Sequence, residues 1–282
     1  MMKNPVQTNI IERTSRRSYV SEDLPAEILD RIQNLLNSSS KGPLGTEIKF
    51  ELIRKFSDEN IKMKLGTYGF IRDARYFIAG EIIPTADAFL DYGYLLEEIF
   101  LELTDLSLGT CWLGGTFDRK EFAKTINLGS ESVIPAISPV GYPTPSRSLG
   151  DRVIRMGAGS KKRKPWESLF FQKGIGKPLQ KEKSEEDIID ILEMVRLAPS
   201  ASNKQPWRII FDNNVFHMFL ERNPGYGKMF GKIDLQMVDM GIAMCHLALT
   251  AREYGKEIMW NKDNVDQNVD GMEYVISAKL LS

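Results

Sequence analysis

The predicted elements of the chain occur twice in the same order, and this repeat limits the folds that the chain can adopt. In each half a helix is followed by a polar loop, two strands, a long apolar helix and a further strand. The long helices share an ending, because Leu103-Thr104 and Gly109 recur at equal spacing as Leu249-Thr250 and Gly255. A repeat far longer than solenoid repeats predicts two half-domains that pack as a pair. The alternative is that helix and strand recur by chance in an ordinary α+β protein.

Apolar periodicity and turn residues place these elements along the chain. In the first half we expect a helix over Ser21–Asn37 with Asp23 as its cap, strands at Lys49–Arg54 and Tyr76–Gly80, a helix from Thr85 to Leu106, and strands at Gly109–Leu113 and Val133–Val140. In the second we expect a helix from Ser184, its cap, to Arg196, a hairpin of Trp207–Phe211 and Val215–Glu221, a helix from Leu235 to Tyr254, and strands at Ile258–Trp260 and Tyr274–Leu280. The halves are predicted to span residues 1–160 and 161–282, and residues 143–183 are predicted to form a long connection.

Composition excludes several classes of protein. The net charge of -1 gives no reason to expect nucleic acid or an anionic membrane as a partner. The cysteines, Cys111 and Cys245, form neither a disulfide framework nor a zinc pattern, so we expect no metal site and a reducing cytoplasm. The N-terminus has no apolar signal region, and the most apolar helical stretch, Gly241–Ala251, is too short to span a bilayer. We therefore expect a cytoplasmic protein outside the membrane.

The first segment suited to ligand binding is Arg13-Thr14-Ser15-Arg16-Arg17. Guanidinium groups match phosphate oxygens bidentately, and hydroxyl groups add neutral donors for a polar sugar chain. In an extended chain Arg13, Ser15 and Arg17 would point to one side. The alternative is a solvated basic stretch near the N-terminus.

The second segment runs from Ala198 to Trp207 and contains Pro199, Ser200, Ala201, Asn203 and Gln205. Pro199 ends a helix and Pro206 forces an extended entry into a strand. Small residues let the backbone approach a flat ligand, and the two amides can both donate and accept hydrogen bonds. A plain helix exit with Trp207 in the core would explain the prolines but not the cluster of small polar residues.

Two further segments complete the candidate site. Leu108–Gly115 is an apolar strand that ends in Gly114 and Gly115, and it brings bare backbone N–H groups to a strand end, where ligands commonly bind. Trp112 could instead belong to the core, and Cys111 is expected to be a small buried residue without chemistry. The basic run Lys161–Lys164 is a surface cluster unless the fold returns it to the phosphate.

Taken together and in this order, these segments resemble the nitroreductase superfamily. Arg13–Arg17 resembles its Arg-x-Ser-x-Arg/Lys signature, and Ala198–Trp207 resembles its Ala-Pro-Ser-x-x-Asn-x-Gln-Pro-Trp segment at nearly every position. Gly109–Gly114, Gly141-Tyr142-Pro143 and Lys161–Pro165 match its later landmarks. The resemblance implies an α+β fold with a mainly antiparallel sheet in each half, flanked by helices, and FMN bound between the halves. It also implies reduction of nitro compounds, quinones or flavins by NAD(P)H.

The resemblance also assigns roles to particular residues. Arg13, Ser15, Lys161 and Arg163 would hold the phosphate and ribityl chain of FMN, and Arg17 would lie near N1 and O2 of the ring, where its charge stabilises the anionic hydroquinone. From the other half the ring would be lined by Pro199, Ser200, Ala201, Asn203 and Gln205. Leu113 and Gly114 would approach N5, with Thr14 and Trp112 as neighbouring contacts. Tyr68 would replace the asparagine and lysine contacts that the family has in the middle of the first half.

The sequence departs from the pattern of ordinary members in one respect. Ser38–Leu44, after the first helix, lacks the asparagine and tryptophan, and Lys177–Lys183, before the second-half helix, has no Arg-x-Ser motif. Each half has therefore kept one side of a site. We expect a monomer that acts as a pseudo-dimer, with one complete FMN site and one degenerate counterpart.

The function that follows is an FMN-dependent NAD(P)H oxidoreductase for small electron-poor acceptors. The cofactor carries the redox chemistry, so no acid–base side chain is nominated, and His217 and His246 are expected to be structural. Another flavin reaction, such as reductive dehalogenation or flavin destruction, is an alternative within the family. A flavin-binding sensor without turnover and a structural protein without a cofactor are alternatives from other classes.

Overall fold

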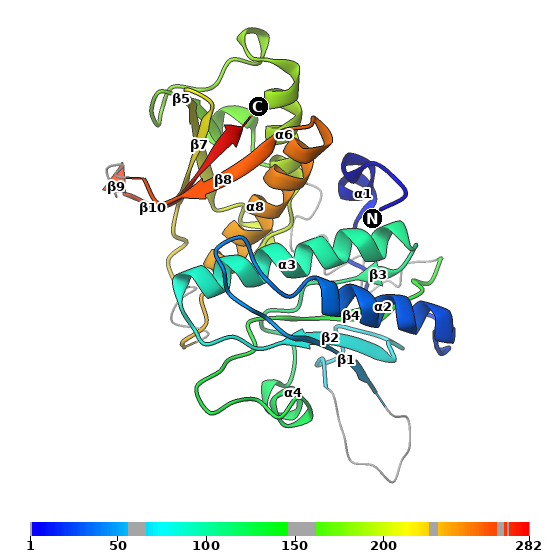
Figure 1. Cartoon of the computed structure of the whole chain (residues 1–282). Coiled ribbons are helices and arrows are strands. Elements are labelled where there is room, and N and C mark those ends of the chain that lie inside the picture. Colours follow the sequence, from blue (N-terminus) through cyan, green and yellow to red (C-terminus); the bar gives the residue numbers. More distant parts are fainter. Residues whose placement is uncertain are drawn as a thin grey trace.

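The chain folds into two sheets that lie at opposite ends of the molecule, with two long helices between them (Figure 1). This computed structural model describes residues 2–55, 66–145, 162–225, 231–263, 268–269 and 271–281. The two long helices are α3 (Ala86–Asp105) and α8 (Leu235–Glu253), and they pack directly on each other. No helix in the described part of the chain is long and apolar enough to cross a membrane.

The first sheet is antiparallel and has the strand order β1-β2-β4-β3. Its strands are β1 (Phe50–Arg54), β2 (Tyr76–Gly80), β3 (Gly109–Thr110) and β4 (Ile137–Gly141). The accompanying helices are α1 (Val6–Glu12), α2 (Ala26–Ser38) and α4 (Arg119–Thr125). Side chains of β2 alternate, so that Tyr76 and Ile78 join the main core with α3, whereas Phe77 packs against Phe122 of α4 on the other face. Helices therefore cover both faces of this sheet.

The second sheet repeats this topology and adds one strand at its edge. Its order is β5-β6-β7-β10-β8, and the last four strands correspond to β1-β2-β4-β3. The strands are β5 (Phe170–Gln172), β6 (Trp207–Asp212), β7 (Val215–Leu220), β8 (Glu257–Asn261), β9 (Asn268–Val269), which pairs with β10, and β10 (Met272–Leu281). Helix α6 (Glu186–Leu197) corresponds to α2, as α8 does to α3. The α+β fold with two related halves, packed as a pseudo-dimer, is thus confirmed.

The register of the repeat differs from the one that the sequence spacing suggests. Helix α3 ends at Asp105 and a left-handed residue, Ser107 (φ 61°), follows its cap. Helix α8 ends at Glu253, and Gly255 (φ 69°) occupies the same position after its cap. Gly255 therefore corresponds to Ser107 and not to Gly109. Counted back from these ends, Leu90-Asp91-x-Gly93 corresponds to Val238-Asp239-x-Gly241.

These equivalent glycines are the point at which the long helices cross. A Cβ atom on Gly93 would lie 2.1 Å from the carbonyl oxygen of Val238, and one on Gly241 would lie 2.0 Å from that of Leu90. The two close approaches are related by the repeat, so the pseudo-twofold axis passes through this crossing. Any larger residue would push the helices, and with them the two halves, apart.

Most predicted elements are confirmed, and the predicted caps are wrong. Pro25 and not Asp23 precedes α2, and Asp23 instead accepts a hydrogen bond from Tyr76 Oη at 2.9 Å. Helix α6 begins after Glu185, and the Ser184 hydroxyl donates to Gln180 O. The hairpin is confirmed, because Asn213 and Asn214 (φ 49° and 61°) form the left-handed turn that its geometry requires.

The segment predicted to be a connection is structured near its end. Strand β5 pairs with β6 in parallel, the one parallel strand pair in the described sheets. Trp166 packs its ring on Phe170 at a centroid distance of 4.6 Å. A segment that follows the first half in sequence thus extends the sheet of the second half. The boundary near residue 160 stays a prediction, because residues 146–161 lie outside the described part.

Candidate functional site

A cavity of about 1190 Å³ lies between the two halves and takes its lining from both. Arg13, Thr14, Ser15 and Arg17 form one part of the wall, and the loop from Pro199 to Asn203 forms another. The segment from Trp112 to Lys120 and the N-terminal part of α8 line further parts of the cavity. Arg13 and Asn203, far apart in the sequence, share this single cavity.

The N-terminal basic segment is held in place by strand β3. Ser15 forms a parallel bridge with Thr110, and the Arg16 N–H donates to Thr110 O at 2.8 Å. The Arg16 side chain turns away and packs on Gly109, whereas Arg13 and Arg17 line the cavity. The extended backbone therefore presents alternate arginines to the cavity, as its two-residue period requires.

A fully buried carboxylate holds the first of these arginines. The Oε1 atom of Glu97, on α3, lies 3.1 Å from Arg13 Nε. The Oε2 atom accepts a hydrogen bond from Trp112 Nε1 at 2.7 Å. Burial alone would raise the pKa of Glu97, but the Arg13 and His246 charges and the Trp112 hydrogen bond outweigh burial, and the pKa lies below its ordinary value. Glu97 therefore stays ionised and fixes both Arg13 and Trp112 at the cavity wall.

His246 of α8 joins the same cluster from the second half. Its Nδ1 lies 2.8 Å from Met194 O and its Nε2 lies 3.1 Å from Glu97 Oε1. A carbonyl and a carboxylate can only accept, so the ring is held between two acceptors. The cluster thus joins α8 of the second half to α3 of the first beside the cavity.

Arg163 brings a further positive charge from the segment before β5. Its Nη1 donates to Asn203 Oδ1 and its Nη2 to Leu197 O, both at 2.7 Å. Burial, together with the neighbouring charges of Arg13 and Arg196, lowers the pKa of Arg163 to about 10. A guanidinium crowded by other cations in this way would be stabilised by a bound anion.

The loop after α6 reaches the cavity in a strained conformation. Ser202, Asn203 and Gln205 have positive φ angles of 48°, 55° and 46°, a region that residues other than glycine seldom adopt. Side-chain bonds hold this geometry, since Ser200 Oγ accepts from Gln205 N and Asp239 Oδ1 accepts from Ala201 N, each at 2.8 Å. Strain maintained by surrounding contacts is often found where a loop binds a ligand.

Comparisons with known proteins decide the family. A family model described as "Putative TM nitroreductase" matches residues 6–251. The chain belongs to this nitroreductase family. A solved structure of "a putative nitroreductase" from Thermotoga maritima shares the fold. The alignment covers 99% of this chain and 94% of the other chain, with a TM-score of 0.62 and 24% identity. Among curated proteins, none matches the chain.

Two smaller solved structures each align with half of this nitroreductase. The alignment with a nitroreductase family protein from Clostridium novyi covers 50% of this chain and 87% of the other chain, at 17% identity and a TM-score of 0.41. An FMN-dependent nitroreductase from Clostridium difficile covers 50% of this chain and 88% of its own, at 18% identity and a TM-score of 0.39.

The structure brings most of the expected site residues to the cavity. The lining contains Arg13, Thr14, Ser15, Arg17, Tyr68, Trp112, Leu113, Gly114, Arg163, Pro199, Ser200, Ala201 and Asn203. Tyr68 lies at the rim, with 69% of its surface exposed. Lys161 lies outside the described residues.

Two expected contacts have a different arrangement. Gln205 is not part of the lining. Its Oε1 accepts from Lys164 N at 2.8 Å and its Nε2 donates to Asn203 O at 3.1 Å, so Gln205 joins the basic segment to the loop. The Leu113 N–H group already donates to Ile137 O within the sheet. The N–H group of Gly114 is therefore the candidate backbone donor to a ligand.

Several lining residues have no counterpart among the sequence predictions. On α8, Leu235, Val238, Asp239 and Ile242 share one helical face toward the cavity. The motif Asp-x-Gly occurs in both halves, as Asp91-x-Gly93 and Asp239-x-Gly241. An alignment of the halves in the register of the structure would have singled out Asp239. Glu97 carried no signal, because a lone acid in an apolar helix gives no indication of its partners. In the described part of the chain no cluster of His, Cys, Asp and Glu could hold a metal ion.

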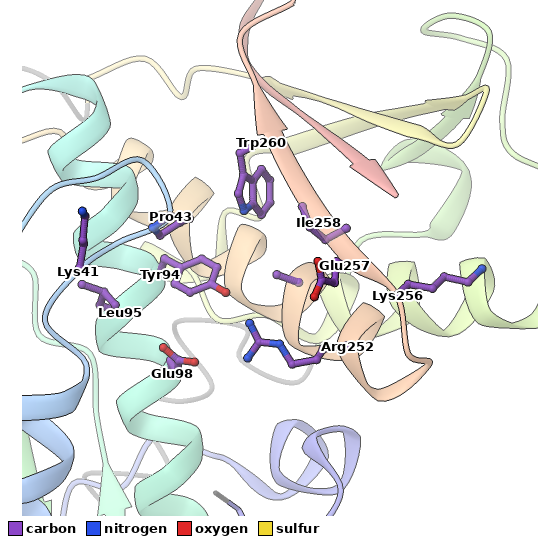
Figure 2. A pocket seen from close by; sticks show the side chains of 11 residues that line it. Lys41, Pro43, Tyr94, Leu95, Glu98, Arg252, Lys256, Glu257, Ile258 and Trp260 are labelled. Carbon is purple, nitrogen blue, oxygen red and sulfur yellow. The ribbon is translucent and has the colours of Figure 1, made fainter. Parts of the chain in front are cut away.

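The repeat-related position carries a smaller hollow of about 440 Å³ (Figure 2). Lys41 and Pro43 line it from the loop after α2, and Trp260 occupies the position that corresponds to Trp112. Figure 2 shows Tyr94 and Glu98 of α3 beside it, with Arg252 of α8 close by. Its lining includes no amide side chain among the described residues, unlike that of the larger cavity.

Proposed function

We propose that this nitroreductase binds FMN in the large cavity and uses NAD(P)H to reduce nitro compounds, quinones or similar small electron-poor acceptors. One observation carries the proposal: the lining of a single cavity combines three arginines, Arg13 and Arg17 from the first half and Arg163 from the second, with an apolar wall from α8. A cofactor that combines a phosphate with a planar ring requires both.

The arginine part of the lining fits a phosphate. Arg13 is buried, and its Nη1 atom has no hydrogen-bond partner among the described residues. A buried donor without a partner is costly and is rare in folded proteins. With Arg163 nearby and the hydroxyl groups of Thr14 and Ser15 in the same wall, this part of the lining would hold a phosphate and the polar chain attached to it.

The apolar wall fits a flat ring. Leu235, Val238 and Ile242 give an apolar surface along α8, and Pro199–Ala201 add small residues to the same lining. When bound, FMN supplies hydride transfer between nicotinamide and acceptor. The protein orients the ring, excludes water with the apolar wall and places the positive charge of Arg17 near it. In this scheme both substrates use the same open side of the cavity in turn.

The decisive experiment is an absorption spectrum of the purified full chain with the ratio of flavin to protein. We expect a yellow protein with one FMN per chain, because the second hollow lacks the arginine segment. Anaerobic addition of NADH or NADPH should bleach the flavin, and a nitroaromatic should restore the colour with turnover.

Other outcomes would identify the alternatives. Bound flavin that neither nicotinamide bleaches would favour a binding or sensor protein. Bleaching without nitroaromatic turnover would favour another flavin reaction, such as reductive dehalogenation. A colourless protein that takes up no added FMN would contradict the proposal.

A further inference from the structure

Two aspartates at equivalent positions of the repeat hold their loops differently. Asp91 of α3 accepts from Leu44 N at 2.9 Å and from Thr46 N at 2.8 Å, so both its oxygens bind the loop after α2. Asp239 of α8 accepts from Ala201 N at 2.8 Å through Oδ1, which binds the loop after α6. Its Oδ2 has no hydrogen-bond partner among the described residues. The aspartate that lines the cavity, Asp239, has therefore kept the loop contact and left one oxygen unused.

Asp239, the residue that carries the unused oxygen, is part of the cavity lining. Asp239 is only 3% exposed, and it lines the cavity between the apolar side chains of Val238 and Ile242. An ionised carboxylate in such surroundings would carry an unpaired charge, which is far more costly than a neutral acid. Burial, with the charge of Asp234 added, raises the pKa of Asp239 well above its usual range, against the effect of the Ala201 hydrogen bond.

We propose that Asp239 is a neutral carboxylic acid whose Oδ2–H donates a hydrogen bond to an acceptor oxygen or nitrogen of a planar ring bound in the cavity. The neutral acid uses its carbonyl oxygen for Ala201 N–H and its hydroxyl for the ligand, so both polar atoms are satisfied only when the cavity is filled. The assignment rests on the proposed function, and it adds a donor that sets which rings bind well. The acceptor atom belongs either to FMN or to a nitro or quinone group of the substrate.

The ligand test compares two substitutions of Asp239 with one matched control. Asp239→Leu has the same branched shape and removes both the donor and the acceptor for Ala201 N–H, whereas Asp239→Asn keeps that acceptor and an N–H donor without a titratable group. The control is Gln236→Leu, because Gln236 is buried on the same helix, also has an unpartnered atom, Nε2, and does not line the cavity.

The measurements are the FMN dissociation constant, from fluorescence quenching, and the KM for nitrobenzene. We expect Asp239→Leu to weaken one of the two by roughly three- to tenfold, the value of a single hydrogen bond. The affected constant identifies the source of the acceptor atom. Asp239→Asn should retain most of the affinity, and Gln236→Leu should change neither constant. Unchanged constants in Asp239→Leu would overturn the assignment while leaving the proposed function intact.

An infrared difference spectrum gives a readout that does not depend on turnover. Wild-type protein minus Asp239→Asn at neutral pH should show the C=O stretch of a protonated carboxyl group, and FMN or nitrobenzene should shift it. A carboxylate signal in its place would overturn the assignment even if the Leu variant failed to fold. A wild-type protein that takes up no FMN would instead overturn the proposed function, and with it the ligand that Asp239 is expected to bind.

Discussion

Glu97 Oε1 and His246 Nε2 lie 3.1 Å apart in the core, and they join α3 of the first half to α8 of the second. Both side chains are fully buried. The same carboxylate pairs with Arg13 at the cavity wall, so one acid in the core couples the packing of the two halves to the position of a ligand-binding arginine.

Glu97→Gln should destabilise the fold by about 3–5 kcal/mol, because it leaves the charge of Arg13 buried without a counter-ion. The lowered pKa of Glu97 also predicts a pH dependence. The stabilisation that ionised Glu97 gives to the folded state is complete above the ordinary glutamate pKa of about 4.3. It is lost as the pH falls below that value toward the pKa of Glu97 in the folded state. Chemical denaturation at several pH values should show a flatter acid limb in the variant.

Glu98→Gln is the matched control for this prediction. Burial raises the pKa of Glu98, with Glu102 acting in the same direction and Arg252 opposing. Its ionised form is therefore disfavoured in the folded state, and amidation should leave the free energy of unfolding at neutral pH unchanged or higher. Equal losses in both variants would mean that the Glu97 cluster has no special role.

Gly93→Ala and Gly241→Ala should each destabilise the protein by about 1–3 kcal/mol, because a Cβ atom at either position meets backbone of the other helix. Helix propensity alone predicts the opposite sign, a gain of about 1 kcal/mol. The control is Gly174→Ala, where a Cβ has nothing within 4 Å, so little change is expected. Urea denaturation measures all three, and a stabilised Gly241→Ala variant would disprove the close crossing.

Arg163→Gln should weaken FMN binding by roughly 10- to 100-fold, which corresponds to the loss of a charged hydrogen bond of about 1.5–3 kcal/mol. Riboflavin lacks the phosphate, so its affinity should change little. Titration of both ligands against wild type and variant tests this. Lys124→Gln removes a charge from an exposed side chain of α4 and should affect neither ligand. A parallel loss of riboflavin affinity would mean that Arg163 acts through the loop that it holds at Asn203 and not through the phosphate.

Arg17→Ala should weaken FMN retention and lower the reduction potential of the bound flavin. If Arg17 stabilises the anionic hydroquinone by about 1.4 kcal/mol, the two-electron potential falls by roughly 30 mV. Arg16→Ala is the neighbouring control, because the Arg16 side chain packs on Gly109 outside the cavity lining. A potential and an affinity that do not change in Arg17→Ala would contradict the assigned position.

The helices, strands and candidate segments could be predicted because their signals are local. Strand β2 follows from its apolar run, the turn at Asn213-Asn214 follows from residues that tolerate positive φ, and the long helices follow from their length and composition. Caps were less predictable, because Asp23 accepts hydrogen bonds from Tyr76 and Arg54, far away in the sequence.

The sequence by itself determined the two-half plan and the segments that line one cavity, because periodicity and motif residues act within a few positions of the chain. Only the tertiary structure decided the register of the repeat, the crossing at Gly93 and Gly241, the pairing of β5 with the second sheet, and the partners of Glu97 and Asp239. Each of these depends on the packing of two distant segments, and the environment of a buried charge or of a missing Cβ exists only after that packing has formed.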